Sequence, residues 1–349
     1  MHLHPATPAL AAAVLFGAST PLAKWLVGEV PPLLLAGLLY LGSGIGLSLL
    51  MLLRRVAGRS PAAATSWPRR DWPWLAGAIV AGGMLGPVLL MAGLARSSAA
   101  SAALLLNLEA VLTALIAWWV FHENASRRIV AGFAAIVAGG VLLAWEPGAT
   151  RLSPGALLIA AACLCWAIDN NLTRKVAEHD ALVVAGLKGL VAGSCNTALA
   201  LATGATWPEW STLAAALAVG FLGYGVSLAL FVVGLRQLGT ARTGAYFSLA
   251  PLFGVALALL LWPALPAWTF WLALALMAAG TVVHLREHHE HEHLHEPMTH
   301  THPHVHDAHH QHAHDFAWDG REPHTHEHAH AALRHSHPHV PDIHHRHRH

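Results

Sequence analysis

The chain has 349 residues, of which 55% are hydrophobic and only 11% are charged, and its formal net charge is +1. Soluble domains average about 25% charged residues, so residues 8 to 285 must face lipid on many sides. The small net charge also argues against a nucleic-acid partner, which requires a basic face. The three cysteines, Cys163, Cys165 and Cys195, lie in apolar stretches and indicate neither a redox compartment nor a metal site.

Apolar runs predict an all-α integral membrane protein with ten transmembrane helices. A span needs about 20 predominantly apolar residues, and the short connections between runs favour antiparallel neighbours. Met1 to Pro5 hold no Lys or Arg, which favours a retained first span over a signal peptide. Three prolines inside these spans, Pro21, Pro87 and Pro251, predict bends. The predicted spans are 9–27, 32–53, 73–95, 98–120, 128–145, 154–173, 181–203, 212–235, 242–262 and 267–285.

The distribution of Lys and Arg predicts the orientation of these spans. With the N-terminus inside, eleven basic residues fall in cytoplasmic loops and three, Lys24, Arg96 and Arg151, fall on the other side. We therefore expect a multi-pass protein of the cell's inner membrane with both termini in the cytoplasm. The eleven are Arg54, Arg55, Arg59, Arg69, Arg70, Arg127, Arg128, Arg174, Lys175, Arg236 and Arg242.

The two halves of the apolar region align with each other in pattern. Residues 15–24 align with 165–174, and residues 93–110 align with 234–251. Each unit contains five predicted spans, and an odd number makes the two copies point in opposite directions across the bilayer. Such inverted repeats are typical of secondary transporters, whose substrate binds near the bilayer midplane between them.

The stretch from Leu104 to Glu123, followed by residues 127–144, resembles the end of a five-helix repeat of the EamA type, in the drug/metabolite transporter superfamily. Phe16 to Lys24 is similar to the first-helix signature of that family. The resemblance covers roughly residues 8 to 285 and implies two inverted repeats, 8–145 and 154–285, that export or import small metabolites. Two positions depart from the family pattern: Ala110 stands where proline is frequent, and His122 where glycine is frequent. The second repeat lacks both acids of the first.

Five polar or charged positions inside the predicted spans are candidates for binding a substrate or coupling ion. They are Glu109, with Asn107 nearby, in the fourth span, Asp169 and Asn170 in the sixth, and Lys188 in the seventh. A charge at the bilayer centre costs several kcal/mol unless it is paired or faces water. Glu109 can bind a cation, an amine or a proton, or it can be a helix-packing acid. Lys188 can pair with Glu109 or Asp169, hold an anionic substrate, or extend its ammonium group to the surface.

Residues 286–349 contain 24 histidines, mostly in alternation with other residues. Neutral imidazole is the commonest protein ligand for borderline divalent metals, so we expect this tail to bind Ni, Co or Zn. It has few apolar residues, which predicts disorder in the absence of metal. A low-complexity tail without a selected role is the alternative. The predicted ligands are His291, His293, His295, His300, His302, His304, His306, His310, His312, His314, His324, His326, His328, His330, His335, His337 and His339.

The sequence therefore predicts a secondary transporter that exports a small solute and carries a metal-binding cytoplasmic tail, with the metal itself as one possible cargo. One alternative is an exporter of a metabolite or amino-acid-like solute, with the tail as bystander or regulator. Another is a membrane-tethered metal store or chaperone. No enzyme motif and no Gly-x-x-x-x-Gly-Lys loop is present, so we expect neither catalysis, a required cofactor nor ATP drive. The expected partners are the lipid bilayer, the solute or metal ion, and a second copy of the chain if a homodimer forms.

Overall fold

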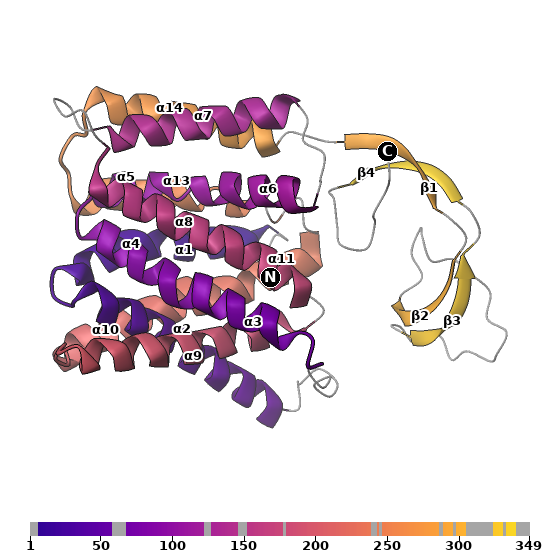
Figure 1. Ribbon diagram of the computed structural model, residues 1–349, viewed down its shortest axis with the longest axis horizontal. Helices are drawn as coiled ribbons and strands as arrows, with labels where there is room; N and C mark the ends of the chain where they lie inside the picture. The colour runs from indigo at the N-terminus through magenta and orange to yellow at the C-terminus, as the bar shows by residue number, and fades with distance from the viewer. Residues whose placement is uncertain are drawn as a thin grey trace. The chain divides into compact units, whose positions relative to one another are not determined.

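The computed structural model describes residues 6–57, 68–121, 127–145, 152–176, 179–238, 243, 246–285, 289–295, 298–304, 324–330 and 333–339. The chain divides into two compact units, Met1–Glu287 and His288–His349. The first unit is helical and the second contains short strands (Figure 1).

The first half of the helical unit forms five helical segments within the described residues. The third segment is continuous but changes helix type in its middle, and the fourth is divided at Leu106 and Asn107. The elements are α1 (Thr7–Val27), α2 (Pro32–Val56), α3 (Trp72–Ala78), η1 (Ile79–Leu85), α4 (Gly86–Leu94), α5 (Ala99–Leu105), α6 (Leu108–Phe121) and α7 (Arg127–Ala144).

The second half forms five further segments among the described residues. The eighth segment of the chain again changes type in its middle. The elements are α8 (Pro154–Thr173), η2 (Arg174–Val176), α9 (Ala181–Ala202), α10 (Trp210–Gly220), η3 (Phe221–Val226), α11 (Ser227–Leu238), α13 (Ala250–Leu261) and α14 (Trp268–Leu285).

Seven of these segments are long and apolar enough to cross a membrane, counting the described residues alone. Three apolar helices are shorter: Arg128–Ala144, Ala250–Leu261 and Trp268–Val283. A helix of n residues is about 1.5n Å long, against a hydrocarbon core of about 30 Å. The mostly helical membrane architecture is therefore confirmed, while the crossings by the three shorter helices stay predictions.

The ninth predicted span, 242–262, differs most from the structure. Its long helix, α13, begins only at Ala250, after a turn at Ser248 and Leu249. Pro251 lies in the first turn of α13, where its missing N–H removes no helical hydrogen bond. The helical backbone is interrupted directly before Pro251, and Pro21 lies inside α1, so the bends predicted at these prolines stay predictions.

Glycines bring α2 and α9 into backbone contact. A Cβ atom built on Gly189 would lie 2.6 Å from the Gly44 nitrogen, and one built on Gly193 would lie 2.5 Å from the Leu41 nitrogen. Helices approach this closely only where small residues line the contact. In Figure 1 the α2 and α9 pair lies at one edge of the helical unit, and α7 packs against α14 at the opposite edge.

Two π-helical stretches interrupt the third and eighth segments. η1 contains Gly82 and Gly83, and η3 contains Gly223 and Gly225. π-helical turns are rare and concentrate at functional sites. The sequence prediction treated both segments as ordinary spans, because hydrophobic periodicity does not distinguish the two kinds of helix.

The second unit contains two antiparallel two-stranded ribbons among its described residues. β1 (His289–His295) pairs with β4 (Leu333–His339), and β2 (Met298–His304) pairs with β3 (His324–His330). The structure thus differs from the predicted disorder in these four stretches. Their strict alternation matches the period of two residues of an extended strand.

Candidate functional site in the helical unit

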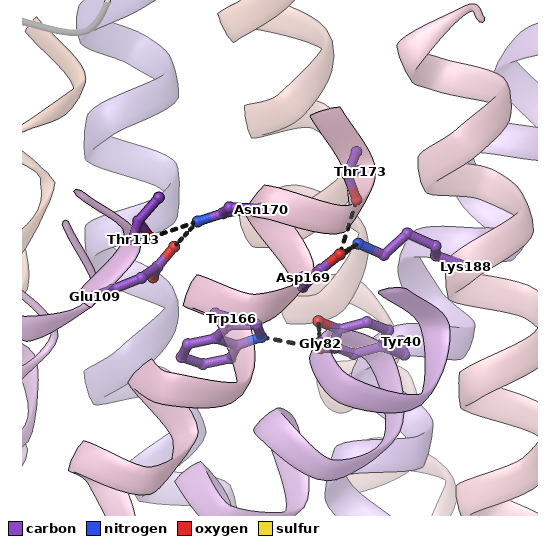
Figure 2. A network of polar contacts seen from close by, with 9 residues as sticks. All are labelled: Tyr40, Gly82, Glu109, Thr113, Trp166, Asp169, Asn170, Thr173 and Lys188. Carbon is purple, nitrogen blue, oxygen red and sulfur yellow. Dashed lines mark hydrogen bonds and ion pairs between the residues drawn. The ribbon is translucent and has the colours of Figure 1, made fainter. Parts of the chain in front are cut away.

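An ion pair inside the helical unit joins α8 to α9. The Lys188 ammonium group donates to both carboxylate oxygens of Asp169, at 2.6 and 2.5 Å from Nζ to Oδ1 and Oδ2. The Thr173 hydroxyl also donates to Oδ1, at 2.8 Å (Figure 2). The Asp169 side chain is 8% exposed and that of Lys188 is 15% exposed. Of the arrangements that the sequence left open for Lys188, the structure therefore shows the pair with Asp169.

The space for the Asp169 carboxylate is created by Gly82 of η1. A Cβ atom built on Gly82 would collide with the carboxyl group of Asp169. Any larger residue at this position would therefore displace either the ion pair or η1. The missing side chain positions the third helical segment directly against the charged part of α8.

The Gly82 carbonyl oxygen accepts two hydrogen bonds. The Trp166 indole N–H of α8 donates at 2.9 Å, and the Tyr40 hydroxyl of α2 donates at 2.8 Å (Figure 2). Two residues further on in η1, the Met84 carbonyl accepts from the Asn196 amide of α9 at 3.2 Å. Carbonyl groups of the π-helical stretch are thus bonded by side chains from three neighbouring helices.

Glu109, near the start of α6, is linked to α8 through an amide. Asn170 Nδ2 donates to Glu109 Oε1 at 3.0 Å and to Thr113 Oγ1 at 3.2 Å, and Figure 2 shows this pair of contacts beside the ion pair. Glu109 forms no ion pair with another described residue and is only partly buried. One carboxylate of the site is therefore paired with a lysine, and the other has no cationic partner among the described residues.

Four of the predicted site residues, Glu109, Asp169, Asn170 and Lys188, meet in this arrangement, which we call the polar network. The fifth, Asn107, does not. Its Nδ2 donates to the Leu104 carbonyl at 2.9 Å, a local bond at the junction of α5 and α6. Its predicted contact with a solute stays a prediction. The remaining members of the polar network are Tyr40, Gly82, Thr113, Trp166 and Thr173.

Five aromatic rings form a second continuous group, which we call the aromatic chain. Tyr40 and Tyr224 have ring centroids 5.7 Å apart, and Tyr224 meets Phe16 edge-on at 6.0 Å. Phe16 lies 5.3 Å from Phe247, which lies 4.9 Å from Phe231. All five rings keep part of their surface accessible. Tyr40 belongs to both groups, because its hydroxyl bonds η1 while its ring contacts Tyr224.

Sequence reasoning missed Tyr40, Gly82, Thr113 and Thr173, and it used Trp166 only to align the repeats. Aromatic, glycine and threonine residues are ordinary members of transmembrane helices, so none of them stands out as a lone charge does. The only sequence signal was the Gly82-Gly83 pair in a predicted span, next to Gly86 and Pro87.

A separate polar contact lies where α3 begins and η2 ends. His179 Nε2 lies 2.9 Å from Asp71 Oδ2, and both side chains are largely buried, at 9% and 14% exposed. Lys175 Nζ lies 6.0 Å from the centroid of the Trp74 ring. A small open pocket of about 210 Å³ adjoins these groups and is lined by Arg70, Asp71, Trp74, Lys175, Val176 and His179.

The predicted metal ligands lie in the second unit. Among residues whose side chains the structure describes, no three His, Cys, Asp or Glu gather closely enough to hold a metal ion. The backbone of thirteen predicted histidine ligands lies in strands: three each in β1, β2 and β4, and four in β3. The other four predicted ligands, His306, His310, His312 and His314, lie outside the described residues.

An apolar helical bundle with a charged network between its helices belongs to the class of multi-pass membrane proteins that handle a polar solute. Comparison with protein families makes this more specific. The chain belongs to the EamA-like transporter family, whose model matches residues 6–145 and 153–286. Members of this family are transporters rather than enzymes, as the sequence analysis expected.

Two curated relatives cover most of the helical unit. An uncharacterized transporter from Methanothermobacter thermautotrophicus is 25% identical over 72% of this chain and 77% of its own length. The aromatic amino acid exporter YddG from Ancylobacter novellus is 27% identical over 78% of this chain and 93% of its own length. A solved crystal structure, 24% identical, shares the fold with a TM-score of 0.60 over 80% of this chain and 95% of that one.

Proposed function

We propose that this chain is a secondary exporter of a small organic solute that carries a positive amino group and an aromatic or apolar body. The carrying observation is Glu109: a partly buried carboxylate inside the bundle, held by Asn170 and not neutralised by any described cation. A carboxylate in such surroundings favours a cationic partner or a proton. The bound solute or a proton would therefore supply the missing positive charge.

The aromatic chain suggests that the other end of the solute is apolar or aromatic. Tyr40 connects this chain of rings to the polar network through its bond to Gly82. Partly accessible rings bind apolar and aromatic groups by surface burial and ring packing, and they attract cations over their faces. The name of the Ancylobacter novellus relative, an aromatic amino acid exporter, supports the same solute class.

A divalent metal is the weaker candidate for cargo. The Asp169 carboxylate is bonded through both oxygens to the Lys188 ammonium group, so it offers no free negative charge to an ion. Glu109 alone can offer one negative charge, which matches a single cationic group better than a divalent ion. These charges support an organic solute with one cationic group over a metal ion.

We further propose that the two halves are inverted repeats that move against each other. Several helix contacts support this, since each occurs twice. α1 packs against α13 and α11, as α8 packs against α6 and α4. α2 packs against η3, as α9 packs against η1. The two π-helical stretches fall in the third and eighth segments, which are equivalent under this relation.

The test is a substrate screen in vesicles reconstituted with the purified protein, with and without residues 286–349. We expect flux of aromatic amino acids or aromatic amines in both forms, little flux of aliphatic acids, and competition between the active solutes. Absence of flux for every solute would instead favour a membrane-tethered metal store. Flux of Ni, Co or Zn that aromatic amines do not inhibit would identify metal as the cargo.

Orientation is a separate part of this proposal. The basic loops support a position in the inner membrane with both termini in the cytoplasm. An impermeant histidine- or cysteine-directed label, with cysteines introduced near each terminus, should react only after the cells are opened. Reaction in intact cells would refute it.

A further inference from the structure

The register of the first ribbon places histidine opposite histidine. In the pairing of β1 with β4, His289 lies opposite His339, His291 opposite His337, and His293 opposite His335. Successive odd-numbered residues of β1 lie on one face, because a strand repeats every two residues. Three cross-strand histidine pairs therefore follow one another along a single face of this ribbon.

The second ribbon repeats the pattern. In the pairing of β2 with β3, His300 lies opposite His328, His302 opposite His326, and His304 opposite His324. The histidines of β1 and β4 have odd numbers, whereas those of β2 and β3 have even numbers. The alternation changes phase between His295 and His300 and again between His330 and His335, and the pairing of histidine with histidine survives both changes.

A common register links the two ribbons. His289 pairs with His339, and Met298 pairs with His330. The first strand of each pairing starts nine residues later in the second ribbon, and its partner lies nine residues earlier. Both ribbons thus fit one antiparallel hairpin register. The two phase changes occur at matching places on its two sides, where His295 lies opposite Leu333 and Met298 opposite His330, and histidine pairs resume beyond them.

We propose that each ribbon holds one borderline divalent metal ion, bound by the four histidines of two successive cross-strand pairs. Directly opposite residues have Cβ atoms about 4.5–5.5 Å apart, and residues two apart on a strand are separated by about 6.6 Å. Four imidazoles based on a rectangle of this size can reach ligand distances of about 2.0–2.1 Å around one ion. Zn²⁺, which prefers four ligands in a tetrahedron, is the natural probe.

Metal and strand pairing depend on each other in this arrangement. An isolated two-stranded ribbon is marginally stable in water, and like charges placed directly opposite destabilise it further. Protonated imidazoles would therefore open the ribbons, while a metal ion binds only neutral imidazoles. Metal binding supplies folding free energy to a segment that cannot form a core. The tail then acts as a metal- and proton-dependent folding element attached to a transporter.

The central pair of each ribbon provides the sharpest test, because any two successive pairs must include it. These pairs are His291 with His337 and His302 with His326. The test variant replaces these four histidines with Asn in the full-length protein. The matched control replaces four histidines that are not among the predicted ligands, His309, His344, His345 and His347, with Asn, so that both proteins keep the same number of histidines.

The measurement is Zn²⁺ bound per chain at equilibrium in detergent solution, against a competing chelator. We expect two tightly held ions in the wild type and in the control, and at least a tenfold loss of affinity for both ions in the central-pair variant. Replacing only His291 and His337 should leave one tight ion. Equal weakening in the central-pair variant and in the control would overturn the proposal, because it would mean that the histidines chelate without a register.

Co²⁺ offers an independent readout of geometry. A four-histidine tetrahedral site should give intense visible absorption bands in the wild type and the control, and the bands should be lost in the central-pair variant. Weak octahedral bands in all three proteins would contradict the proposed sites. Neither measurement depends on transport, so failure here leaves the proposed exporter function standing.

Discussion

The polar network and the aromatic chain share Tyr40 but are held together by different interactions, charge pairing in the first and contact between rings in the second. In the polar network, the buried charges of Lys188 and Asp169 are matched against each other, and removal of either partner leaves a charge without compensation. In the aromatic chain, neighbouring rings lose only surface contact when one of them changes. The comparison teaches that the ion pair holds helices together, while in the proposed exporter the rings would set which solute body is favoured.

Both groups take residues from both proposed repeats, but the acids of the polar network have uncharged counterparts in the opposite half. By the alignment of the halves, Asp169 corresponds to Ser19 and Glu109 corresponds to Ala250. Ser19 carries no charge, and its hydroxyl donates to the Phe16 carbonyl of its own helix. The polar network therefore carries charges and the aromatic chain carries rings. This arrangement suits a solute with an amino group at one end and an aromatic or apolar body at the other.

Breaking the ion pair should have the largest effect. Replacing Lys188 with Met leaves the buried Asp169 carboxylate unpaired, which should destabilise the protein by about 3–5 kcal/mol. Unfolding in detergent micelles measures this, with the exposed Lys175→Met as control. The double variant Lys188→Met with Asp169→Asn should recover most of the loss. A double variant no more stable than Lys188→Met would contradict the paired role.

Neutralising Glu109 should reduce transport with little effect on stability. Glu109→Gln keeps an acceptor for Asn170 but removes the charge that binds the solute. A hydrogen bond to a charged group contributes about 1.5–3 kcal/mol, so flux should fall roughly 10- to 100-fold. Glu29→Gln is the control, since Glu29 accepts from Thr212 at an exposed position. Flux within twofold of wild type would remove Glu109 from the binding site.

Filling the space beside Asp169 should disturb the polar network without changing any charge. Gly82→Ala introduces a Cβ atom where the Asp169 carboxylate lies, and overpacking of this kind costs about 1–3 kcal/mol. Gly28→Ala is the matched control, because its nearest contact would be the Trp25 carbonyl at an ordinary 3.5 Å. The thermal unfolding midpoint of Gly82→Ala should be lower than that of Gly28→Ala. Equal midpoints would show that η1 shifts to accommodate the methyl group at little cost in stability.

Changes in the aromatic chain should alter selectivity more than stability. Phe247→Leu removes the ring contacts with Phe16 and Phe231, worth about 1 kcal/mol. The flux ratio of aromatic to aliphatic amines should therefore fall roughly fivefold. Phe270→Leu, which changes the ring packed against Trp271 in α14, should leave that ratio unchanged. An equal fall in both variants would indicate a general packing defect.

The smallest effect is expected at Tyr40, where the two groups meet. Tyr40→Phe keeps the ring contact with Tyr224 and removes one of the two hydrogen bonds to the Gly82 carbonyl. Because Trp166 still satisfies that oxygen, the loss should be at most about 1 kcal/mol. A destabilisation as large as that of Lys188→Met would show that the hydroxyl belongs to the core of the polar network.

Sequence reasoning located the helices and the charged site residues but not their arrangement. Glu109, Asp169 and Lys188 stood out because a charge within an apolar run is costly and therefore conspicuous. Which acid pairs with Lys188 depends on the packing of η1 against both α8 and α9, and one sequence does not encode such contacts in a readable pattern. The late start of α13 and the π-helical stretches depend in the same way on tertiary contacts, which override local hydrophobic periodicity.

The contact between α2 and α9 has a mechanical consequence. Gly44, Gly189 and Gly193 leave no side-chain layer between the two backbones, so these helices cannot slide past each other without a collision. The two helices can still tilt relative to each other. Opening one side of the transporter while closing the other would then be a rotation about the contact between α2 and α9. Gly189→Ala adds a methyl group to this contact and should therefore block the rotation and transport.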